Sequence, residues 1–369
     1  LGDMATELGA RAPNDRQLIL TAFFAGLTLG QPFYGILSDS TGRKPAMIAG
    51  TLLFIIGGLM CAWTQSFGLL LLGRTLQGFG AAGPRVVAVA IVRDVHAGAA
   101  MARVMSFVSS VFILVPILAP SFGQGVLLIA SWRAIFWALV VIASFNLLWF
   151  AVRQPETLIG SKRSRFSPGP IFQAAAFTFR SRVTVGYMLA SGFIFGSFLN
   201  YLSTAQQIFQ EQYDLGRWFP LLFGALAAGI GVASLVNAKL VLRFGPRALC
   251  RWAATTVAGV SFVFLAYAWS QGGHPPITAF MAYMLLCFFG NGVLFGNYSA
   301  RAMEPMGHVA GVAAAIIGSG SSLLALVVST PFGRAYDGTV IPLVFAFALL
   351  SAAALLVTEY AEAPGRAKN

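Results

Sequence analysis

Two arginines stand inside one long apolar segment of the sequence, where a charged side chain is unusual. Arg74 and Arg85 both lie in 69–92, and at about 100° per residue a helix brings them onto one side, roughly three turns apart. A cation inside a membrane span is costly and usually faces a protein interior or a wet cavity. The pair predicts a pathway for polar or charged groups along a stripe that includes Gln77. The alternative for each arginine is that it reaches out to a membrane surface.

Groups that could carry protons or break bonds are scarce at this depth. All 12 Asp and Glu residues fall in loops or near the ends of apolar segments, and His96, His274 and His308 lie in loops. The three cysteines, Cys61, Cys250 and Cys287, lack metal-ligand spacing. No nucleophile, paired acids or metal cluster stands in an apolar segment, so the sequence predicts no enzyme, no metal and no cofactor.

The composition is that of a membrane protein. Hydrophobic residues make up 57% of the chain and charged residues 10%, far below the roughly 25% charged residues of soluble domains. The formal net charge of +12 could suggest nucleic acid, but the cations are spread between apolar segments and are not gathered on one face. We therefore expect a lipid bilayer around the protein and no nucleic-acid partner.

Apolar segments separated by polar breaks predict eleven membrane helices. Each is near the length of about 20 residues that crosses a bilayer. If successive loops alternate between the two sides, most of the 24 Lys and Arg fall on one side, which the positive-inside rule assigns to the cytoplasm together with the C-terminus. The predicted helices are 17–38, 46–63, 69–92, 104–128, 134–152, 183–204, 218–241, 252–270, 276–299, 309–333 and 339–358.

The loop between the first two of these helices resembles a signature of the major facilitator superfamily. Residues 35–45, GILSDSTGRKP, match the pattern G-x-L-[SA]-D-x-x-G-R-[KR] of that family. The resemblance implies a cytoplasmic gate in which charged residues lock the two halves of the protein together. The alternative is a tight turn with solvated charges. The implied gate residues are Gly35, Asp39, Gly42, Arg43 and Lys44, with Arg93 and Asp94 at the end of the segment 69–92.

Two further segments resemble motifs of this family. Residues 74–80, RTLQGFG, are similar to its fourth-helix pattern R-x-x-Q-G-x-G. Residues 115–124 are similar to the fifth-helix motif of its antiporters, through Pro116, Pro120 and Gly123, although Gln124 replaces the usual second glycine. Proline bends a helix and glycine admits a close neighbour, so such a segment could seal a gate; membrane helices also carry both residues without a mechanistic role.

The chain divides into two similar halves. We expect an N-terminal bundle at 1–152, a basic cytoplasmic linker at 153–182 and a C-terminal bundle at 183–369. Segment 239–247 resembles a degenerate copy of 35–45, and 330–334 echoes 119–124. Repeated halves are typical of alternating-access transporters, whose site lies near the bilayer midplane. Polar residues at that depth are candidates for the pathway, with interhelical packing as the alternative for each: Gln31, Asn146, Asn200, Tyr201, Asn291, Asn297 and Tyr298.

Together these motifs resemble the bicyclomycin/chloramphenicol-resistance (Bcr/CflA-type) branch of drug:proton antiporters. The resemblance implies an all-α fold of twelve helices in two pseudo-symmetric six-helix bundles in a bacterial inner membrane, exporting small lipophilic drugs in exchange for protons as a monomer. Residues 1–5 look like the tail of an opening helix, so we expect the first helix, with the proton-carrying carboxylate, to be missing. An eleven-helix protein is the alternative. Other functions left open are a proton-coupled symporter or facilitator for a metabolite, and a receptor or structural membrane protein.

Overall fold

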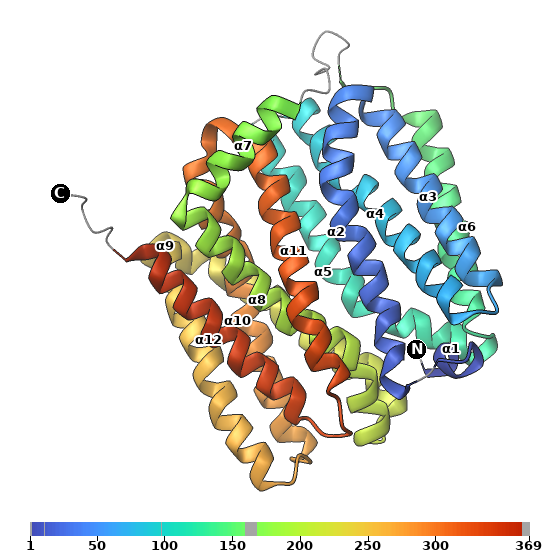
Figure 1. Ribbon diagram of the computed structural model, residues 1–369, viewed down its shortest axis with the longest axis vertical. Coiled ribbons are helices and arrows are strands. Elements are labelled where there is room, and N and C mark those ends of the chain that lie inside the picture. Colours follow the sequence, from blue (N-terminus) through green and yellow to red (C-terminus); the bar gives the residue numbers. More distant parts are fainter. Residues whose placement is uncertain (1, 11, 97, 159–167, 364–369) are drawn as a thin grey trace. The chain divides into compact units, whose positions relative to one another are not determined.

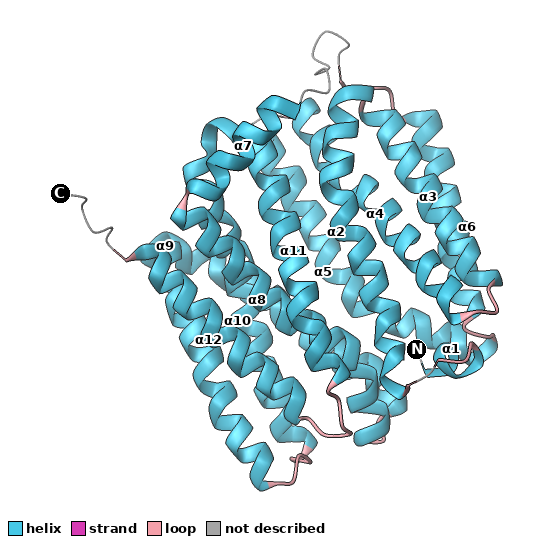
Figure 2. Cartoon of the chain, viewed as in Figure 1, coloured by secondary structure: helices cyan, strands magenta, loops and turns pink. Residues whose placement is uncertain are grey.

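The computed structural model describes residues 2–10, 12–96, 98–158 and 168–363. These residues form helices joined by short loops, and no strand occurs among them (Figure 2). Nine helices within the described part of the chain are long and apolar enough to cross a membrane. The prediction of an all-α, multi-pass membrane protein is therefore confirmed.

The chain forms two compact units, Leu1–Pro168 and Gly169–Asn369. Figure 1 labels the helices in chain order. The helices of unit 1 are α1 (Gly2–Glu7), α2 (Leu18–Thr41), α3 (Arg43–Trp63), α4 (Phe67–Val95), α5 (Gly98–Ile129) and α6 (Arg133–Arg153). Those that follow are α7 (Pro168–Arg180), α8 (Arg182–Gln206), α9 (Phe219–Ser270), α10 (Ile277–Met303), α11 (Ala310–Arg334) and α12 (Ile341–Glu362).

Gly42 and Gly245 have similar backbone conformations with positive φ at bends between successive spans of the two units. Gly42 has φ 114° and ψ 162° between α2 and α3. Gly245 has φ 75° and ψ 157° inside α9, so α9 is two spans joined by a sharp bend. Glycine adopts this region without the steric cost that other residues incur. The matching backbone agrees with the resemblance of segment 239–247 to 35–45, and the bend lies between the two predicted spans 218–241 and 252–270.

Small residues bring α4 into close contact with α2. A Cβ atom on Gly26 of α2 would lie 2.0 Å from the carbonyl oxygen of Thr75, and one on Gly78 of α4 would lie 1.9 Å from that of Phe23. Close backbone approach through small residues is the usual basis of helix packing in membranes. Because α4 also packs against α3, it is held from two sides, and Arg74 is carried on this fixed helix.

In unit 2 the central helix is α8, which packs against α10, α11 and α12. Its start is defined by Ser181, whose hydroxyl accepts a hydrogen bond from the backbone N–H of Thr184 at 3.2 Å; such N-caps satisfy amides that have no partner within the helix. Buried aromatic rings line its interior face, including Tyr187 and Tyr201. This packing places Asn200 in the interior of the unit.

The expected linker at 153–182 contains a helix. Residues 168–180 form α7, where two prolines occur in the first turn, which tolerates them, and three alanines follow, which favour helix. Residues 159–167 lie outside the described part of the chain. The basic linker and its limits stay a prediction.

Candidate functional site

Arg74 lies between helices of unit 1 and has only neutral hydrogen-bond partners. Its Nε donates to the carbonyl oxygen of Ile19 at 3.3 Å, and its Nη1 donates to Oε1 of Gln77 at 2.5 Å. The guanidinium carbon is 4.5 Å from the ring centroid of Phe23 and 5.8 Å from that of Phe136. Cation–π contacts of this kind partly replace lost water. In the described part of the chain no carboxylate pairs with this cation.

Gln77 is fully buried beside Arg74, and its Nε2 has no hydrogen-bond partner. A buried polar atom without a partner costs free energy, so this amide is available to a ligand or a water molecule. Gln31 of α2 also has an unpartnered buried Nε2. Unit 1 therefore presents two free amide donors and one cation that no described carboxylate neutralises.

Arg85 differs from Arg74 in its surroundings. Its side chain is exposed, and no hydrogen bond or ion pair joins it to another described residue. The structure does not bring the two arginines into one contact network. Their common role in a pathway stays a prediction.

The expected gate residues assemble around Arg43, which is only 4% exposed. Its guanidinium pairs with Asp39, donates from Nε to Asp94 at 2.8 Å and donates from Nη1 to the hydroxyl of Ser38 at 3.0 Å. Residues at the ends of α2, α3 and α4 thus converge on one cation. The carbonyl oxygen of Gly35 accepts from the hydroxyl of Ser38 at 3.0 Å. Lys44 and Arg93 lie beside this group in the sequence, and within the described part of the chain their side chains make no hydrogen bond or ion pair with it.

Glu156, which follows α6, completes this cluster, and the sequence reasoning did not include it. Its Oε1 accepts from the backbone N–H of Arg43 at 3.0 Å and its Oε2 from that of Lys44 at 3.1 Å. Burial opposes ionisation, but these bonds and one from the backbone N–H of Leu158 hold the pKa of Glu156 below its ordinary value. A carboxylate is stabilised at a helix N-terminus because unpartnered amides point at it. The available signal was an acidic residue directly after a predicted span.

The polar candidates of unit 2 separate into two kinds. Asn297 is paired: its Nδ2 donates to Oδ1 of Asn237 at 2.8 Å and to the carbonyl oxygen of Val293 at 3.0 Å. Asn200 and Asn291 are fully buried, and neither amide has a partner for either polar atom. Two unsatisfied buried amides are unusual in a packed interior, so these are the stronger candidates for ligand or water contact.

The two tyrosine candidates take part in aromatic packing. Tyr201 stacks on Phe223 with centroids 5.6 Å apart and meets Phe288 edge-on at 4.8 Å. Tyr298 meets Tyr187 at 5.6 Å. Both are fully buried, and the hydroxyl of Tyr201 has no hydrogen-bond partner.

A second charged cluster, also absent from the sequence-based set, lies at the ends of α10 and α12. Glu362 pairs with Arg301, accepts from the hydroxyl of Tyr187 at 2.9 Å and lies 3.4 Å from Nε of Arg247. Arg301 also pairs with Glu304. Each unit thus ties its helix ends together with a buried or half-buried arginine.

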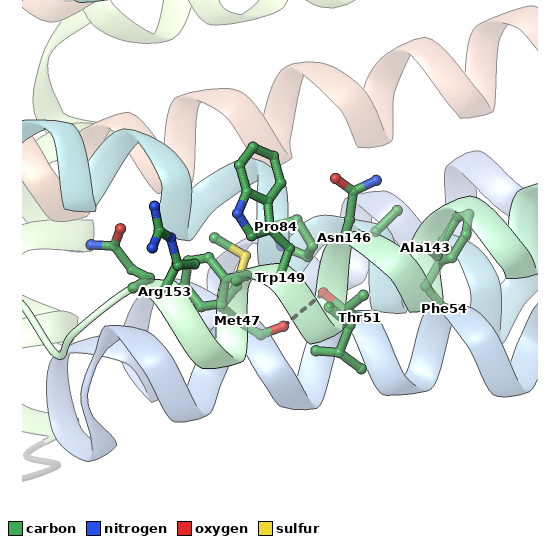
Figure 3. A pocket seen from close by; sticks show the side chains of 12 residues that line it. Met47, Thr51, Phe54, Pro84, Ala143, Asn146, Trp149 and Arg153 are labelled. Carbon is green, nitrogen blue, oxygen red and sulfur yellow. Dashed lines mark hydrogen bonds between the residues drawn. The ribbon is translucent and has the colours of Figure 1, made fainter.

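A cavity of about 670 Å³ lies between α3, α4 and α6. Figure 3 shows Met47 and Thr51 on one wall and Asn146 and Trp149 on another, with the hydroxyl of Thr51 bonded to the carbonyl oxygen of Met47 at 2.9 Å. Asn146 donates to the carbonyl oxygen of Ile142 at 2.9 Å and is exposed. The lining is apolar except for a few groups, as in many small-molecule sites.

Counting from Gly42 in unit 1 and Gly245 in unit 2 gives the matching positions of the two units. Met47, Thr51 and Phe54 correspond to Cys250, Ala254 and Val257. These are buried to 2%, 0% and 1% exposure, and Cys250 and Ala254 share a core with Tyr187, Ala190 and Ile194 of α8. In unit 2, α8 covers the surface that remains open in unit 1.

The antiporter motif of α5 is only partly described. Pro120 is half-buried, and a Cβ on Gly123 would meet nothing within 4 Å. The side chain of Pro116 lies outside the described residues. Close helix contact at Gly123 is therefore not present within the described structure, and a gating role for these residues stays a prediction.

Two units of membrane-spanning helices, with positive-φ glycines at the corresponding bends Gly42 and Gly245, define a polytopic membrane protein. Residues 1–330 match the family model described as Major Facilitator Superfamily. The chain belongs to this family and is a membrane transporter, and not an enzyme.

Relatives and a solved structure agree with this assignment. The chain is 31% identical to the uncharacterized MFS-type transporter YdgK of Bacillus subtilis, over 92% of this chain and 84% of YdgK. It is 29% identical to the bicyclomycin resistance protein homolog of Haemophilus influenzae, over 84% of this chain and 77% of that protein. The crystal structure of a D-xylose-proton symporter has a TM-score of 0.77 at 16% identity, covering 98% of this chain and 92% of that one; this likeness shows the fold alone.

Proposed function

We propose that this protein is a drug:proton antiporter of a bacterial inner membrane that exports small lipophilic compounds by alternating access and works as a monomer. The observation that carries the proposal is Arg74, a cation between membrane helices that only neutral groups contact. Such a residue is costly unless it serves a path. The name of the Haemophilus influenzae relative supports a drug as the substrate.

The small number of unpartnered polar groups favours a lipophilic substrate. The buried amide side chains with unpartnered atoms include those of Gln31 and Gln77 in unit 1 and of Asn200 and Asn291 in unit 2. A sugar demands many hydrogen bonds, whereas a lipophilic drug needs a mostly apolar site with a few fixed polar points. Aromatic rings such as Phe198 and Phe295, 6.0 Å apart, offer contact area of the required kind.

Proton coupling needs a carboxylate that titrates within the membrane. The described carboxylates lie in loops or near helix ends, so we propose that a further helix packs over the open cavity between α3, α4 and α6 and carries this group. The repeat supports the proposal, because α8 fills the corresponding place in unit 2. A carboxylate brought near Arg74 would have its charged form favoured, which would promote release of its proton.

The proposal is tested by transport in membrane vesicles that carry a proton gradient. The full-length protein should accumulate a lipophilic drug such as chloramphenicol in inside-out vesicles, and collapse of the gradient should stop it. Arg74→Ala should lower the rate at least about tenfold, the loss that one ionic contact of about 1.4 kcal/mol would give. Arg180→Ala, which removes an exposed cation from α7, is the matched control.

Three results would contradict this function. Movement of the drug in the same direction as the protons would identify a symporter. Accumulation that survives loss of the gradient would exclude proton coupling, and equal rates for Arg74→Ala and Arg180→Ala would remove Arg74 from the mechanism.

A further inference from the structure

The bend of α9 carries cations that the proposed transport function does not use. Arg243 precedes Gly245, and Arg247 and Arg251 follow it one turn apart. The side chains of Arg247 and Arg251 are 63% and 67% exposed. The bend joins two membrane spans, so these arginines stand where a helix leaves the hydrocarbon.

Large apolar side chains surround the same bend. Phe244 meets Trp252 edge-on with ring centroids 5.3 Å apart, and both are exposed, at 41% and 53%. The guanidinium carbon of Arg243 lies 5.1 Å from the Phe244 ring. Aromatic rings beside arginine are typical of the level at which lipid headgroups meet acyl chains.

A cavity of about 380 Å³ opens between this part of α9 and the end of α12. Phe244, Arg247, Arg251 and Trp252 line one wall, and Glu359 and Glu362 line the other. Its mouth is therefore cationic and aromatic on the side of α9.

The acidic residues of α12 neutralise these cations only in part. Glu359 lies 3.0 Å from Nε of Arg251. Glu362 lies at the longer distance of 3.4 Å from Nε of Arg247, because Arg301 and Tyr187 hold it on its other side. Arg243 has no carboxylate partner among the described residues. An excess of positive charge remains at the bend.

The corresponding bend in unit 1 shows what such a place binds. There the carboxylate of Glu156 accepts from the backbone N–H groups of Arg43 and Lys44, directly after Gly42. After Gly245 the position of Arg43 is taken by Pro246, which has no backbone N–H. No described carboxylate accepts from the N–H of Arg247, since Glu362 contacts side chains instead. At this bend the groups that can bind an anion from outside the protein are therefore the side chains of the three arginines and not a pair of backbone N–H groups.

We propose that the bend of α9 is a binding site for the headgroup of an anionic phospholipid such as phosphatidylglycerol. Arg243, Arg247 and Arg251 contact the phosphate, and Phe244 and Trp252 contact the upper acyl chains. Basic pockets between membrane helices bind acidic headgroups in this way. The two aromatic side chains favour a lipid over free phosphate, because only a lipid covers apolar surface.

Native mass spectrometry of the purified full-length protein tests the site. The detergent-solubilised protein is titrated with phosphatidylglycerol and, separately, with phosphatidylcholine. Phosphatidylglycerol should bind more tightly, and the double variant Arg243→Gln/Arg251→Gln should weaken its binding by about 10- to 30-fold, as expected for two cations near a headgroup. Binding of phosphatidylcholine should be unchanged. Arg247 is kept because it contacts Glu362.

The matched control is Arg180→Gln/Arg334→Gln, which removes two exposed arginines from α7 and α11. It should bind phosphatidylglycerol as the unaltered protein does. Equal weakening in both double variants would reduce the effect to net charge and overturn the site. Full displacement of the lipid by millimolar inorganic phosphate would identify a site for soluble anions, and equal affinity for the two lipids would exclude headgroup recognition.

Discussion

At the scale of single residues, the sequence predicted the contacts of charged side chains better than those of amide side chains. The signature of residues 35–45 contains Asp39 and Arg43, and Asp94 was a candidate from the end of the segment 69–92. The three side chains meet in the structure. Glu156 was missed because its role depends on the end of α6 returning to the start of α3, a tertiary relation that no local pattern contains.

Polar residues of one type could not be ranked from the sequence. The sequence does not distinguish Asn297 from Asn200 and Asn291, because all three are polar residues within apolar segments. The structure pairs Asn297 with Asn237 and leaves both atoms of Asn200 and Asn291 without partners. The difference arises from what faces each amide across the bundle, and a buried pair stabilises whereas a buried orphan costs free energy.

Glu156→Gln should destabilise unit 1 by about 1 kcal/mol at neutral pH, because the charged cap of α3 is lost. The folded protein lowers the pKa of Glu156 from 4.5, so the cap stabilises above that value and is lost as the pH falls through the lower folded value. Thermal unfolding at pH 7 and pH 3.5 measures this. The unaltered protein should lose more stability on acidification than the variant.

Glu304→Gln is the control for that measurement. Glu304 is exposed in its ion pair with Arg301, at 62%, and exposed pairs contribute little. A pH dependence of Glu156→Gln as steep as that of the unaltered protein would assign the acid sensitivity to other groups.

At the scale of elements, hydropathy was sufficient to find the helices. Every predicted span has a counterpart between α2 and α12, since a bilayer selects length and apolarity together. The predicted spans 218–241 and 252–270 lie on the two sides of the bend at Gly245, where Arg243, Arg247 and Arg251 form the polar break. The sequence did not show α7, whose helical alanines lie outside any span.

Helices α2 and α4 contact each other through glycines, and hydropathy does not show which glycines make the contact. Gly26 and Gly35 both lie on α2, but a Cβ at Gly26 would enter the backbone of α4, whereas one at Gly35 would meet nothing within 4 Å. Gly26→Ala should cost about 1–3 kcal/mol as an overpacked contact. Gly35→Ala should leave the melting temperature unchanged or raise it slightly, because alanine favours helix.

Melting of the two glycine variants in detergent, followed by size-exclusion chromatography after heating, checks this prediction. Equal melting temperatures for Gly26→Ala and Gly35→Ala would mean that α2 and α4 separate at no cost. That result would contradict the packing that holds Arg74.

At the scale of the whole molecule, the repeat is visible in the backbone more clearly than in the sequence. Gly42 and Gly245 share a positive φ, although the loop around Gly245 has no counterpart of Asp39. The arginines at the two bends pair with different carboxylates. Arg43 pairs with Asp39 and Asp94, and Arg247 pairs with Glu362. Sequence similarity between the halves is weak because packing fixes backbone geometry and leaves the choice of side chains free.

The orientation of the protein in the membrane follows from its cations and can be measured with introduced cysteines. Cys61, Cys250 and Cys287 are all buried, so background labelling should be low. Gln65 and Gln271 are exposed in the loops after α3 and α9, and Pro155 and Pro305 are exposed after α6 and α10. Each position receives one cysteine.

The positive-inside rule predicts different labelling for the two pairs. A membrane-impermeant maleimide should label Gln65→Cys and Gln271→Cys in intact cells. Pro155→Cys and Pro305→Cys should react only after the membrane is disrupted, because most Lys and Arg residues lie in loops on the same side of the membrane as these two positions. The reverse pattern would place the Arg43 cluster and the α9 bend outside the cell. Agreement within one unit but not the other would mean that the number of spans between Pro155 and Gln271 is wrong, because each additional span exchanges the sides of every loop that follows.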